Sequence, residues 1–237
     1  MARAPEPLLL VGAGGFGRET AEVVDAVNDL HRDRHGAARW DLRGFLDDDP
    51  ARWGRLVSGT PVVGPVDALA DHHDGRAVVC AGNPRDRTAK ARIVDRLTRL
   101  GVEDDRYATV VHPAASLARS CELDGGTVVL AGVVATADVS VGAHVGLMPH
   151  VVLTHDDQLA DFVIAGSGAR LAGGVTVDIG AYLGAGCLIR EGLHIGRWAL
   201  VGMGAALTHD VPPAEVWAGV PARYLRTYDL PHEVLST

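Results

Sequence analysis

A short polar stretch interrupts the apolar second half of the chain: residues 154–157 have the sequence THDD. His155 is followed directly by Asp156, and this pairing suits proton transfer. Imidazole exchanges a proton near neutral pH, and a neighbouring carboxylate can fix which ring nitrogen carries it. The pair therefore predicts a general base. The alternative is a polar surface turn without a chemical role.

A second stretch suited to ligand binding lies near the N-terminus, where GAGGFG matches the pattern G-x-G-x-x-G. An apolar run at 8–11 precedes it, and a helical pattern at 18–30 follows. Glycines at such a turn let the backbone approach a ligand, and the helix N-terminus favours phosphate. A turn needed only for packing is the alternative. The residues that we expect to bind substrate here are Gly12, Gly14, Gly15, Phe16 and Gly17.

Polar side chains also follow the next two predicted strands. Asp47 and Asp48 come directly after the strand at 41–46. Asn83 follows the third strand, and Arg87 comes one helical turn later. Ligands of parallel sheets bind at the carboxyl ends of the strands, so we expect these four residues to contact the sugar, base or phosphate of one ligand. Solvated turn residues are the alternative for the aspartates.

Strands and helices alternate through the first 113 residues. Apolar runs predict strands at 8–11, 41–46, 77–81 and 107–111, and helical spacing predicts helices at 18–30 and 84–100. Such alternation indicates a parallel sheet covered on both faces, in an α/β domain over residues 1–113. The unit is short for a complete dinucleotide-binding domain, which has two mononucleotide-binding halves.

The hydrophobic period changes to six residues from Leu117 onward. Every sixth residue from Leu117 to Leu207 is aliphatic, without a slip in register. The residue four places after most of these is also small or apolar. The pattern predicts an all-β parallel β-helix of hexapeptide repeats over residues 114–237, with three short strands per coil and about five coils.

Asp157 departs from this pattern, because the register places its side chain inside the coil. A carboxylate in such a narrow interior is costly unless it is paired. Either the coil bulges at this point, or Asp157 pairs with a neighbour such as His155.

A metal site is a further alternative for the histidines. His150 and His155 are five residues apart, a spacing at which β-helix proteins resembling the gamma-class carbonic anhydrases bind zinc. Those proteins need a third histidine about two coils earlier. This chain has Ala114 and Ala115 there, and His112 precedes the repeat. We therefore expect no metal.

Composition argues against several classes of protein. The formal net charge of −8 disfavours nucleic-acid binding, since no basic stretch could follow a phosphate backbone. No apolar run is long enough to span a bilayer, and the run at 8–11 is too short for a signal peptide. Three unclustered cysteines fit reduced thiols. We therefore expect a cytoplasmic protein without nucleic-acid or membrane partners.

An ordered set of motifs over nearly the whole chain resembles one family. LLLVGAGGFGRE, GFLDDDP, HP at 112–113, the hexapeptide register, THDD and VWAGVPARYL are together similar to the sugar O- and N-acetyltransferases of the sialic acid and bacillosamine type. The resemblance implies a small Rossmann-like N-terminal domain, a left-handed β-helix and a homotrimer. It also implies acetyl-CoA as co-substrate between neighbouring β-helices, and a nucleotide-linked amino sugar on the N-terminal domain.

The resemblance further implies individual roles. His155 aligns with the family's catalytic base, Asp156 with its acidic companion, and the backbone N–H of Gly173 with the donor to the oxyanion. The positions that align with coenzyme-binding residues are Gly173, Gly184, Ala185, Gly202, Gly204, Ala205, Gly219, Pro221 and Arg223. The expected reaction is acyl transfer from acetyl-CoA to an amino or hydroxyl group of a nucleotide-linked sugar, with a 4-amino sugar as the leading candidate.

Two positions depart from the family pattern. Ile164 stands where bacillosamine-pathway relatives often carry a second histidine, and Met203 replaces the middle glycine of a GGG motif. These departures leave the size of the acyl donor and the identity of the acceptor open. The alternative functions are an acyltransferase for a non-nucleotide acceptor, a nicotinamide-dependent oxidoreductase and a non-enzymatic trimeric scaffold.

Overall fold

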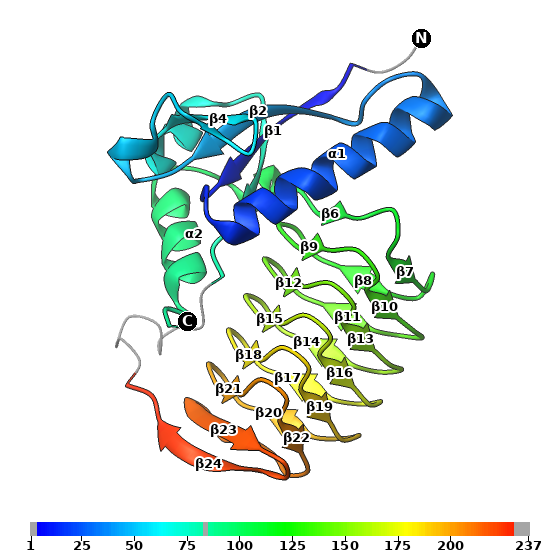
Figure 1. The fold of residues 1–237 in the computed structure, drawn as a ribbon. Helices are drawn as coiled ribbons and strands as arrows, with labels where there is room; N and C mark the ends of the chain where they lie inside the picture. Colours follow the sequence, from blue (N-terminus) through cyan, green and yellow to red (C-terminus); the bar gives the residue numbers. More distant parts are fainter. Residues whose placement is uncertain (1–3, 83–84, 230–237) are drawn as a thin grey trace.

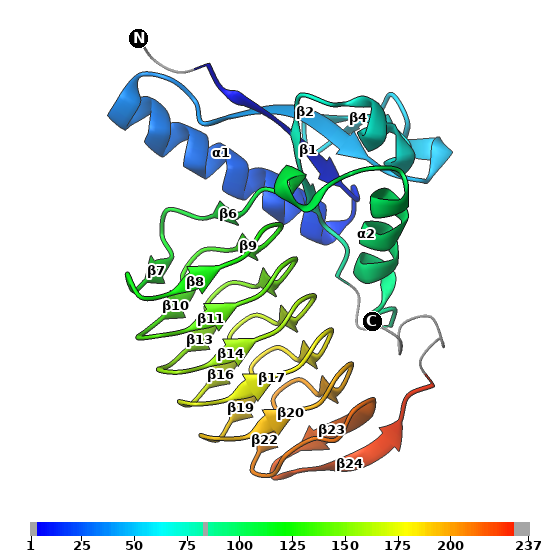
Figure 2. The same ribbon diagram turned by 180° about the vertical axis from the view of Figure 1, so that it is seen from behind.

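The computed structural model describes residues 4–82 and 85–229. An α/β unit formed by the first part of the chain stands above a column of stacked coils (Figure 1 and, from behind, Figure 2). Within these described ranges, no helix is long and apolar enough to cross a membrane.

The strands of the N-terminal sheet lie in the order β3-β4-β2-β1-β5. Their bounds are β1 (Glu6–Val11), β2 (Trp40–Leu46), β3 (Leu56–Val57), β4 (Thr60–Gly64) and β5 (Arg76–Val79). Strands β1, β2, β4 and β5 run parallel, while β3 is an antiparallel edge strand beside β4. The parallel sheet expected from the alternation is confirmed, and β3 and β4 extend it beyond the predicted strands.

Helices cover both faces of this sheet. α1 (Gly15–His35) packs on the face to which Leu8 points, and α2 (Ala89–Arg99) packs on the face to which Leu9 points. Both leucines are buried, as expected for a strand inside a doubly covered sheet. Short 3-10 helices complete the unit: η1 (Pro50–Arg52), η2 (Val66–Asp71) and η3 (Asp104–Arg106).

The C-terminal unit is a three-sided parallel β-helix, and each side is a sheet built from one short strand per coil. The β13 sheet contains β7 (Ser116–Leu117), β10 (Val134–Ala135), β13 (Val152–Leu153), β16 (Arg170–Leu171), β19 (Leu188–Ile189) and β22 (Ala206–Leu207). The β14 sheet contains β8 (Glu122–Leu123), β11 (Ser140–Val141), β14 (Gln158–Leu159), β17 (Thr176–Val177) and β20 (His194–Ile195). The β15 sheet contains β6 (Val110–Val111), β9 (Val128–Val129), β12 (Gly146–Leu147), β15 (Ile164–Ala165), β18 (Tyr182–Leu183), β21 (Leu200–Val201), β23 (Glu215–Gly219) and β24 (Ala222–Thr227).

Each coil stacks directly on the next. Val134 pairs with Val152, eighteen residues later, and the other strands from β6 to β22 repeat this step. At the end of the column β23 follows β21 after sixteen residues, and β24 pairs antiparallel with β23. The second residue of each strand points inward, so that Leu153, Leu159 and Ala165 are all buried in one continuous core. Burying a leucine or valine side chain contributes about 1.5–3 kcal/mol, which makes this interior the main source of stability. The hexapeptide register is confirmed.

Several predicted elements differ at their ends: the helix predicted at 18–30 spans Gly15–His35, and the strand predicted at 77–81 is Arg76–Val79. Two further differences are larger. The predicted strand at 107–111 divides between the units: Tyr107 bridges Ala77 in the N-terminal sheet, whereas β6 pairs with β9 as the first strand of the β-helix. The predicted helix at 84–100 begins at Ala89 in the described residues, because residues 85–88 form a turn. A short apolar run does not reveal which sheet it joins, and this explains the division of the strand at 107–111.

Side chains of the N-terminal unit anchor it to the β-helix. The Phe16 ring of α1 is buried, and both it and Ile164 lie against Gly146. The Lys90 ammonium of α2 donates to the carbonyl of His144 at 2.8 Å, and burial lowers the pKa of Lys90 to about 8. The two units therefore share a packed interface, with α2 beside the column.

Gly17 is a position of the glycine turn where a side chain does not fit. A Cβ atom there would lie 2.0 Å from the Gly12 carbonyl oxygen, whereas no described atom lies within 4 Å of a Cβ at Gly15. We expect Gly17→Ala to lower the free energy of unfolding by about 2 kcal/mol or more, since the added atom meets packed backbone. Gly15→Ala is the control and should stay within about 1 kcal/mol of the unmodified protein. Equal thermal unfolding midpoints for the two variants would contradict this interpretation.

Candidate active site

His155 and Asp156 lie on the outside of the coil, at the corner between β13 and β14. His155 Nδ1 donates to Asp156 Oδ2 at 2.8 Å, and 68% and 65% of the two side chains are exposed. Asp156 has a positive φ of 63°, the backbone conformation that turns the chain at this corner. Because the carboxylate holds the proton on Nδ1, Nε2 is left as a proton acceptor.

Gly173 occupies the same place in the following coil, directly against the His155 ring. A Cβ atom at Gly173 would lie 2.3 Å from Cε1 and 2.4 Å from Nε2 of the imidazole, so only glycine leaves room for the ring. The Gly174 N–H donates to the His155 carbonyl at 2.8 Å and fixes one corner to the other. Within the described chain nothing accepts a hydrogen bond from the Gly173 N–H, which is therefore available to a ligand.

The Asp157 side chain points into the coil, as the register predicts, and is fully buried. Its Oδ2 accepts the Thr154 N–H at 2.8 Å, and its Oδ1 accepts the Val175 N–H at 2.9 Å. Its hydrogen-bond partners are therefore backbone amides and not the His155 ring, which bonds Asp156. Burial raises the pKa of Asp157 to about 6, and the two backbone hydrogen bonds limit the rise because they favour the carboxylate.

A shallow groove of about 470 Å³ runs along the outer face of the β13 sheet. Its lining residues are Val152, Thr154, Arg170, Leu171, Ala172, Leu188, Ile189, Arg190, Ala206 and Leu207. Thr154 and Ala172 directly precede His155 and Gly173 in the chain, so the groove begins beside the histidine. The lining is mostly apolar, with Arg170 and Arg190 as its charged members. Such a surface suits an extended ligand with an apolar arm and anionic groups.

The predicted coenzyme residues other than Gly173 follow the opposite edge of the β13 sheet and the hairpin beyond it. They are Gly184, Ala185, Gly202, Gly204 and Ala205 at the corners before β19 and β22, and Gly219, Pro221 and Arg223 in the β23–β24 hairpin. Around Gly204 there is open space among the described atoms, whereas a Cβ atom at Gly184 would lie 2.5 Å from the Met203 nitrogen. The Ala205 side chain is buried in the coil, so only its backbone can contact a ligand.

The N-terminal glycine turn combines open positions with packed ones. No described atom lies within 4 Å of a Cβ at Gly14 or Gly15, and these residues form the start of α1. Gly12 adopts a φ of 104°, which favours glycine, and Gly17 and Phe16 are needed for packing. The turn therefore offers backbone N–H groups at a helix N-terminus, where an anion is stabilised.

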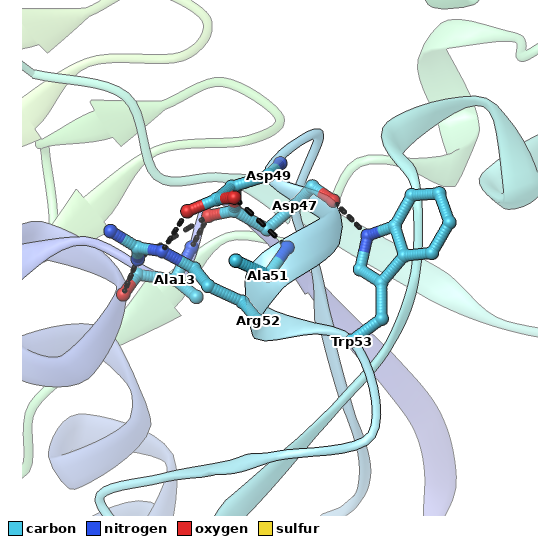
Figure 3. A network of polar contacts seen from close by, with 6 residues as sticks. All are labelled: Ala13, Asp47, Asp49, Ala51, Arg52 and Trp53. Atoms are coloured by element: carbon cyan, nitrogen blue, oxygen red, sulfur yellow. Dashed lines mark hydrogen bonds and ion pairs between the residues drawn. The ribbon is translucent and has the colours of Figure 1, made fainter.

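Asp47 ties this turn to the loop that follows β2 (Figure 3). Its Oδ2 accepts the Ala13 N–H at 2.9 Å and lies 3.6 Å from Arg52 Nη1. Arg52 Nη1 in turn donates to the Ala13 carbonyl at 2.9 Å, and Trp53 Nε1 donates to the Asp47 carbonyl at 2.7 Å. The network holds the glycine turn in place and brings a cation to its edge.

Arg52 is not among the ligand residues predicted from the sequence. The available signal is its position just after the DDDP run, at the carboxyl edge of a parallel strand. Asp48 is engaged elsewhere, because its Oδ1 accepts the Val66 N–H at 3.1 Å and its Oδ2 accepts from Arg96 at 2.7 Å. These bonds give Asp48 a structural role between β2 and α2.

The structure does not bring all predicted ligand residues together. Arg87 is buried near the last coils, where its Nη2 donates to the Trp198 carbonyl at 2.8 Å and its guanidinium covers the Tyr228 ring. Asn83 lies outside the described residues. The glycine turn adjoins the β15 sheet, whereas His155 lies at the corner between β13 and β14. Within one chain the two candidate sites are therefore on different sides of the column.

The histidines do not gather around a metal. No group of three histidine, cysteine, aspartate or glutamate side chains that could hold an ion forms in the part of the chain that the structure describes. His150 lies at the corner before β13, where its ring packs against Gly132, and His155 lies at the corner after β13. Ile164 is also away from His155, buried in the β15 sheet.

Comparison with known proteins identifies the class to which this architecture corresponds. Neither the models of protein families nor the curated proteins give a match to the sequence. Solved structures do match over nearly the whole chain, and they include perosamine N-acetyltransferase from Caulobacter crescentus and the acetyltransferase domain of PglB. The resemblance to hexapeptide-repeat sugar acetyltransferases is thereby confirmed.

Two of the structures with bound ligands illustrate the similarity. The acetyltransferase domain of PglB from Neisseria gonorrhoeae FA1090, in complex with acetyl coenzyme A, is 27% identical with a TM-score of 0.79, covering 94% of this chain and 100% of that chain. PerB from Caulobacter crescentus, in complex with CoA and GDP-perosamine, is 28% identical with a TM-score of 0.79, covering 94% of this chain and 99% of that chain. WeeI from Acinetobacter baumannii AYE, at 24% identity and a TM-score of 0.77 over 93% and 100% of the two chains, shares the fold.

Asp157 gives the folded protein a pH dependence that can be measured. Because folding raises its pKa from 3.8 to about 6, its stabilising contribution is full below about pH 4 and is lost as the pH rises through about 6. The shift corresponds to about 3 kcal/mol at most. Asp157→Asn is the reference, because asparagine cannot ionise. We expect the thermal unfolding midpoint of the unmodified protein to fall relative to that of Asp157→Asn as the pH rises from about 4 through about 6. A difference that stays constant with pH would contradict the burial argument.

Proposed function

We propose that this protein is an acyl-CoA-dependent acyltransferase that transfers an acetyl group from acetyl-CoA to an amino or hydroxyl group of a nucleotide-linked sugar. The observation that carries the proposal is the His155–Asp156 pair, which lies over Gly173 at the start of the apolar groove. Two neighbouring coils therefore bring together a proton acceptor at His155, a free N–H donor at Gly173 and a groove with room for the coenzyme arm. The ligands of PglB and PerB support acetyl-CoA as donor and a nucleotide-linked 4-amino sugar as acceptor.

In the proposed reaction the acceptor nitrogen attacks the thioester carbonyl carbon of acetyl-CoA. His155 Nε2 accepts the proton that the nitrogen loses, and Asp156 stabilises the resulting imidazolium through Nδ1. The Gly173 N–H donates to the oxyanion of the tetrahedral intermediate. Collapse of this intermediate breaks the carbon–sulfur bond. The imidazolium then returns its proton to the departing thiolate, which gives CoA and the acylated sugar.

The groove of the β13 sheet is the proposed coenzyme site. The pantetheine arm would extend from Gly173 across the apolar lining, toward the open backbone at Gly204. Arg170 and Arg190 in the lining carry the charge that the coenzyme's phosphates require. The hairpin from Gly219 to Arg223 would adjoin the adenine end.

The N-terminal unit is the proposed site for the nucleotide. We assign the chain before β6 to a Rossmann-like domain and the chain from β6 onward to a left-handed β-helix, which moves the predicted boundary at 113 to the start of β6. Gly14 and Gly15 have open space around them at the N-terminus of α1, and with Arg52 bonded to the neighbouring Ala13 carbonyl they suit a diphosphate. Because the glycine turn and His155 lie on different sides of one chain, the sugar held by one chain would meet His155 of another. The proposal therefore includes a homotrimer.

Replacing His155 tests the proposed base. With acetyl-CoA, a nucleotide-linked 4-amino sugar and a thiol reagent, the unmodified protein should release CoA, and His155→Ala should lower kcat by at least ~100-fold, as for loss of a general base. His150→Ala is the matched control, since it removes an exposed histidine at the other end of the same strand. Its kcat should stay within about twofold.

Mass measurements in solution accompany this assay, because a trimer of three 24.8-kDa chains is expected for the unmodified protein and both variants. Full activity in His155→Ala would eliminate this residue as the base. Absence of sugar-dependent CoA release from the unmodified protein would contradict the proposed reaction itself.

Gly173→Ala tests whether catalysis needs the space that Gly173 leaves for the His155 ring. The added methyl group would overlap the His155 ring, so we expect kcat to fall ~100-fold while the thermal unfolding midpoint changes little. Glu191→Ala is the control, because Glu191 occupies the equivalent corner position one coil further on. The account would be wrong if Gly173→Ala and Glu191→Ala had the same kcat.

A further inference from the structure

The backbone ladder of the β-helix is interrupted at the corner that carries His155. In the β13 sheet, the residue after each strand donates its N–H to the coil below: Thr136 to the Leu153 carbonyl at 3.1 Å, and Ala172 to the Ile189 carbonyl at 3.0 Å. Thr154 lies between these two positions, and its N–H bonds Asp157 Oδ2 instead. Its hydroxyl takes over the bond to the next coil, donating to the Leu171 carbonyl at 3.1 Å.

Strand pairing changes at the same point. β10 with β13 and β16 with β19 each form two residue pairs, whereas β13 with β16 retains only Val152 with Arg170. At the corner after β13 the Asp157 carboxylate therefore replaces one bond of the regular ladder, while the bond from the Gly174 N–H to the His155 carbonyl remains.

The second oxygen of Asp157 holds the next corner. Its Oδ1 accepts the Val175 N–H at 2.9 Å, and Val175 directly follows the Gly173–Gly174 pair. In the first coil the corresponding N–H, that of Cys121, stays within its own turn and bonds the Ala118 carbonyl at 3.1 Å. One buried side chain thus adds a second connection between the His155 corner and the Gly173 corner, beside the bond from the Gly174 N–H to the His155 carbonyl.

An inward carboxylate is not required by the scaffold. Val139 and Val175 occupy the equivalent inward positions one coil before and one coil after Asp157, and both are buried. A buried charge costs free energy that an apolar residue does not, and replacing it with an apolar residue is often neutral or stabilising. The repeat could therefore be completed by valine at this position, and the departure coincides with the corner of the proposed base.

We propose that Asp157 is a positioning residue for acyl transfer, which fixes the corner of His155 and Asp156 relative to the Gly173 N–H. This inference rests on the proposed function. Asp157 does not touch the reacting atoms: it acts through the Thr154 and Val175 amides. Its removal should move the base and the oxyanion donor relative to each other, and such misplacement lowers kcat more than it changes substrate binding.

The experiment compares the variant Asp157→Val with two other variants, Asp157→Asn and Thr127→Val. Asp157→Asn keeps one carbonyl acceptor. Thr127→Val is the matched control, since Thr127 is also inward and buried, and its hydroxyl accepts the Val145 N–H at 3.1 Å from a corner without His155. We expect Asp157→Val to lower kcat by ~10- to 100-fold, with KM for acetyl-CoA within about twofold and an unchanged or higher unfolding midpoint. Asp157→Asn should retain more activity than Asp157→Val, and Thr127→Val should leave kcat within about twofold.

Hydrogen exchange supplies a readout that does not depend on activity. Peptides that contain Thr154 and Val175 should exchange faster in Asp157→Val than in the unmodified protein, and peptides around Val145 should not. If Asp157→Val keeps full kcat and slow exchange while His155→Ala is inactive, the inference is overturned and the proposed function stands. If the unmodified protein shows no sugar-dependent CoA release, the proposed function fails, and exchange alone decides whether Asp157 holds the two corners. Should Asp157→Val not fold, the same criteria apply to Asp157→Asn.

Discussion

The stacking of one coil on the next is the interaction on which the rest of this molecule depends. Each eighteen-residue coil repeats its strand positions directly above those of its neighbour, so the interior accepts only side chains that pack within one narrow column. This requirement explains the aliphatic residue at every sixth position. It also places equivalent corner residues of successive coils about 5 Å apart. Functional groups on the outside are therefore positioned by a core that they do not enter.

Corner residues interact with their equivalents in the neighbouring coil, and glycine decides where a ring can lie. Rings pack against glycine at His144 over Gly126, at His150 over Gly132 and at Trp198 over Gly180. His155 also packs against a glycine, but Gly173 lies in the following coil, whereas the other three rings pack against a glycine of the preceding coil. Ring packing alone does not identify a base. Two further features distinguish this corner: the Asp156 carboxylate on Nδ1 and the inward Asp157 beneath it. The fold thus supplies the geometry, and two carboxylates adapt one corner for chemistry.

The sequence was sufficient for features that repeat or are local. The six-residue period predicted the β-helix and the inward direction of Asp157, and the adjacency of His155 and Asp156 predicted their pairing. It did not reveal Val175 as a partner of Asp157, because an amide eighteen residues away becomes a neighbour only after the coil closes. Phe16 and Arg87 illustrate the same limit: each follows a ligand-binding pattern, but contacts with the distant coils bury both side chains.

The central claim is that the corner at His155 is where an acceptor sugar receives an acyl group from a coenzyme in the adjoining groove. The most direct measurement is a crystal structure with CoA and a nucleotide-linked 4-amino sugar bound together. The account predicts the sugar amine within about 3 Å of His155 Nε2, with the coenzyme sulfur near Gly173 and the nucleotide on the glycine turn of another chain. A sugar amine bound away from His155, or a coenzyme outside the β13 groove, would contradict it.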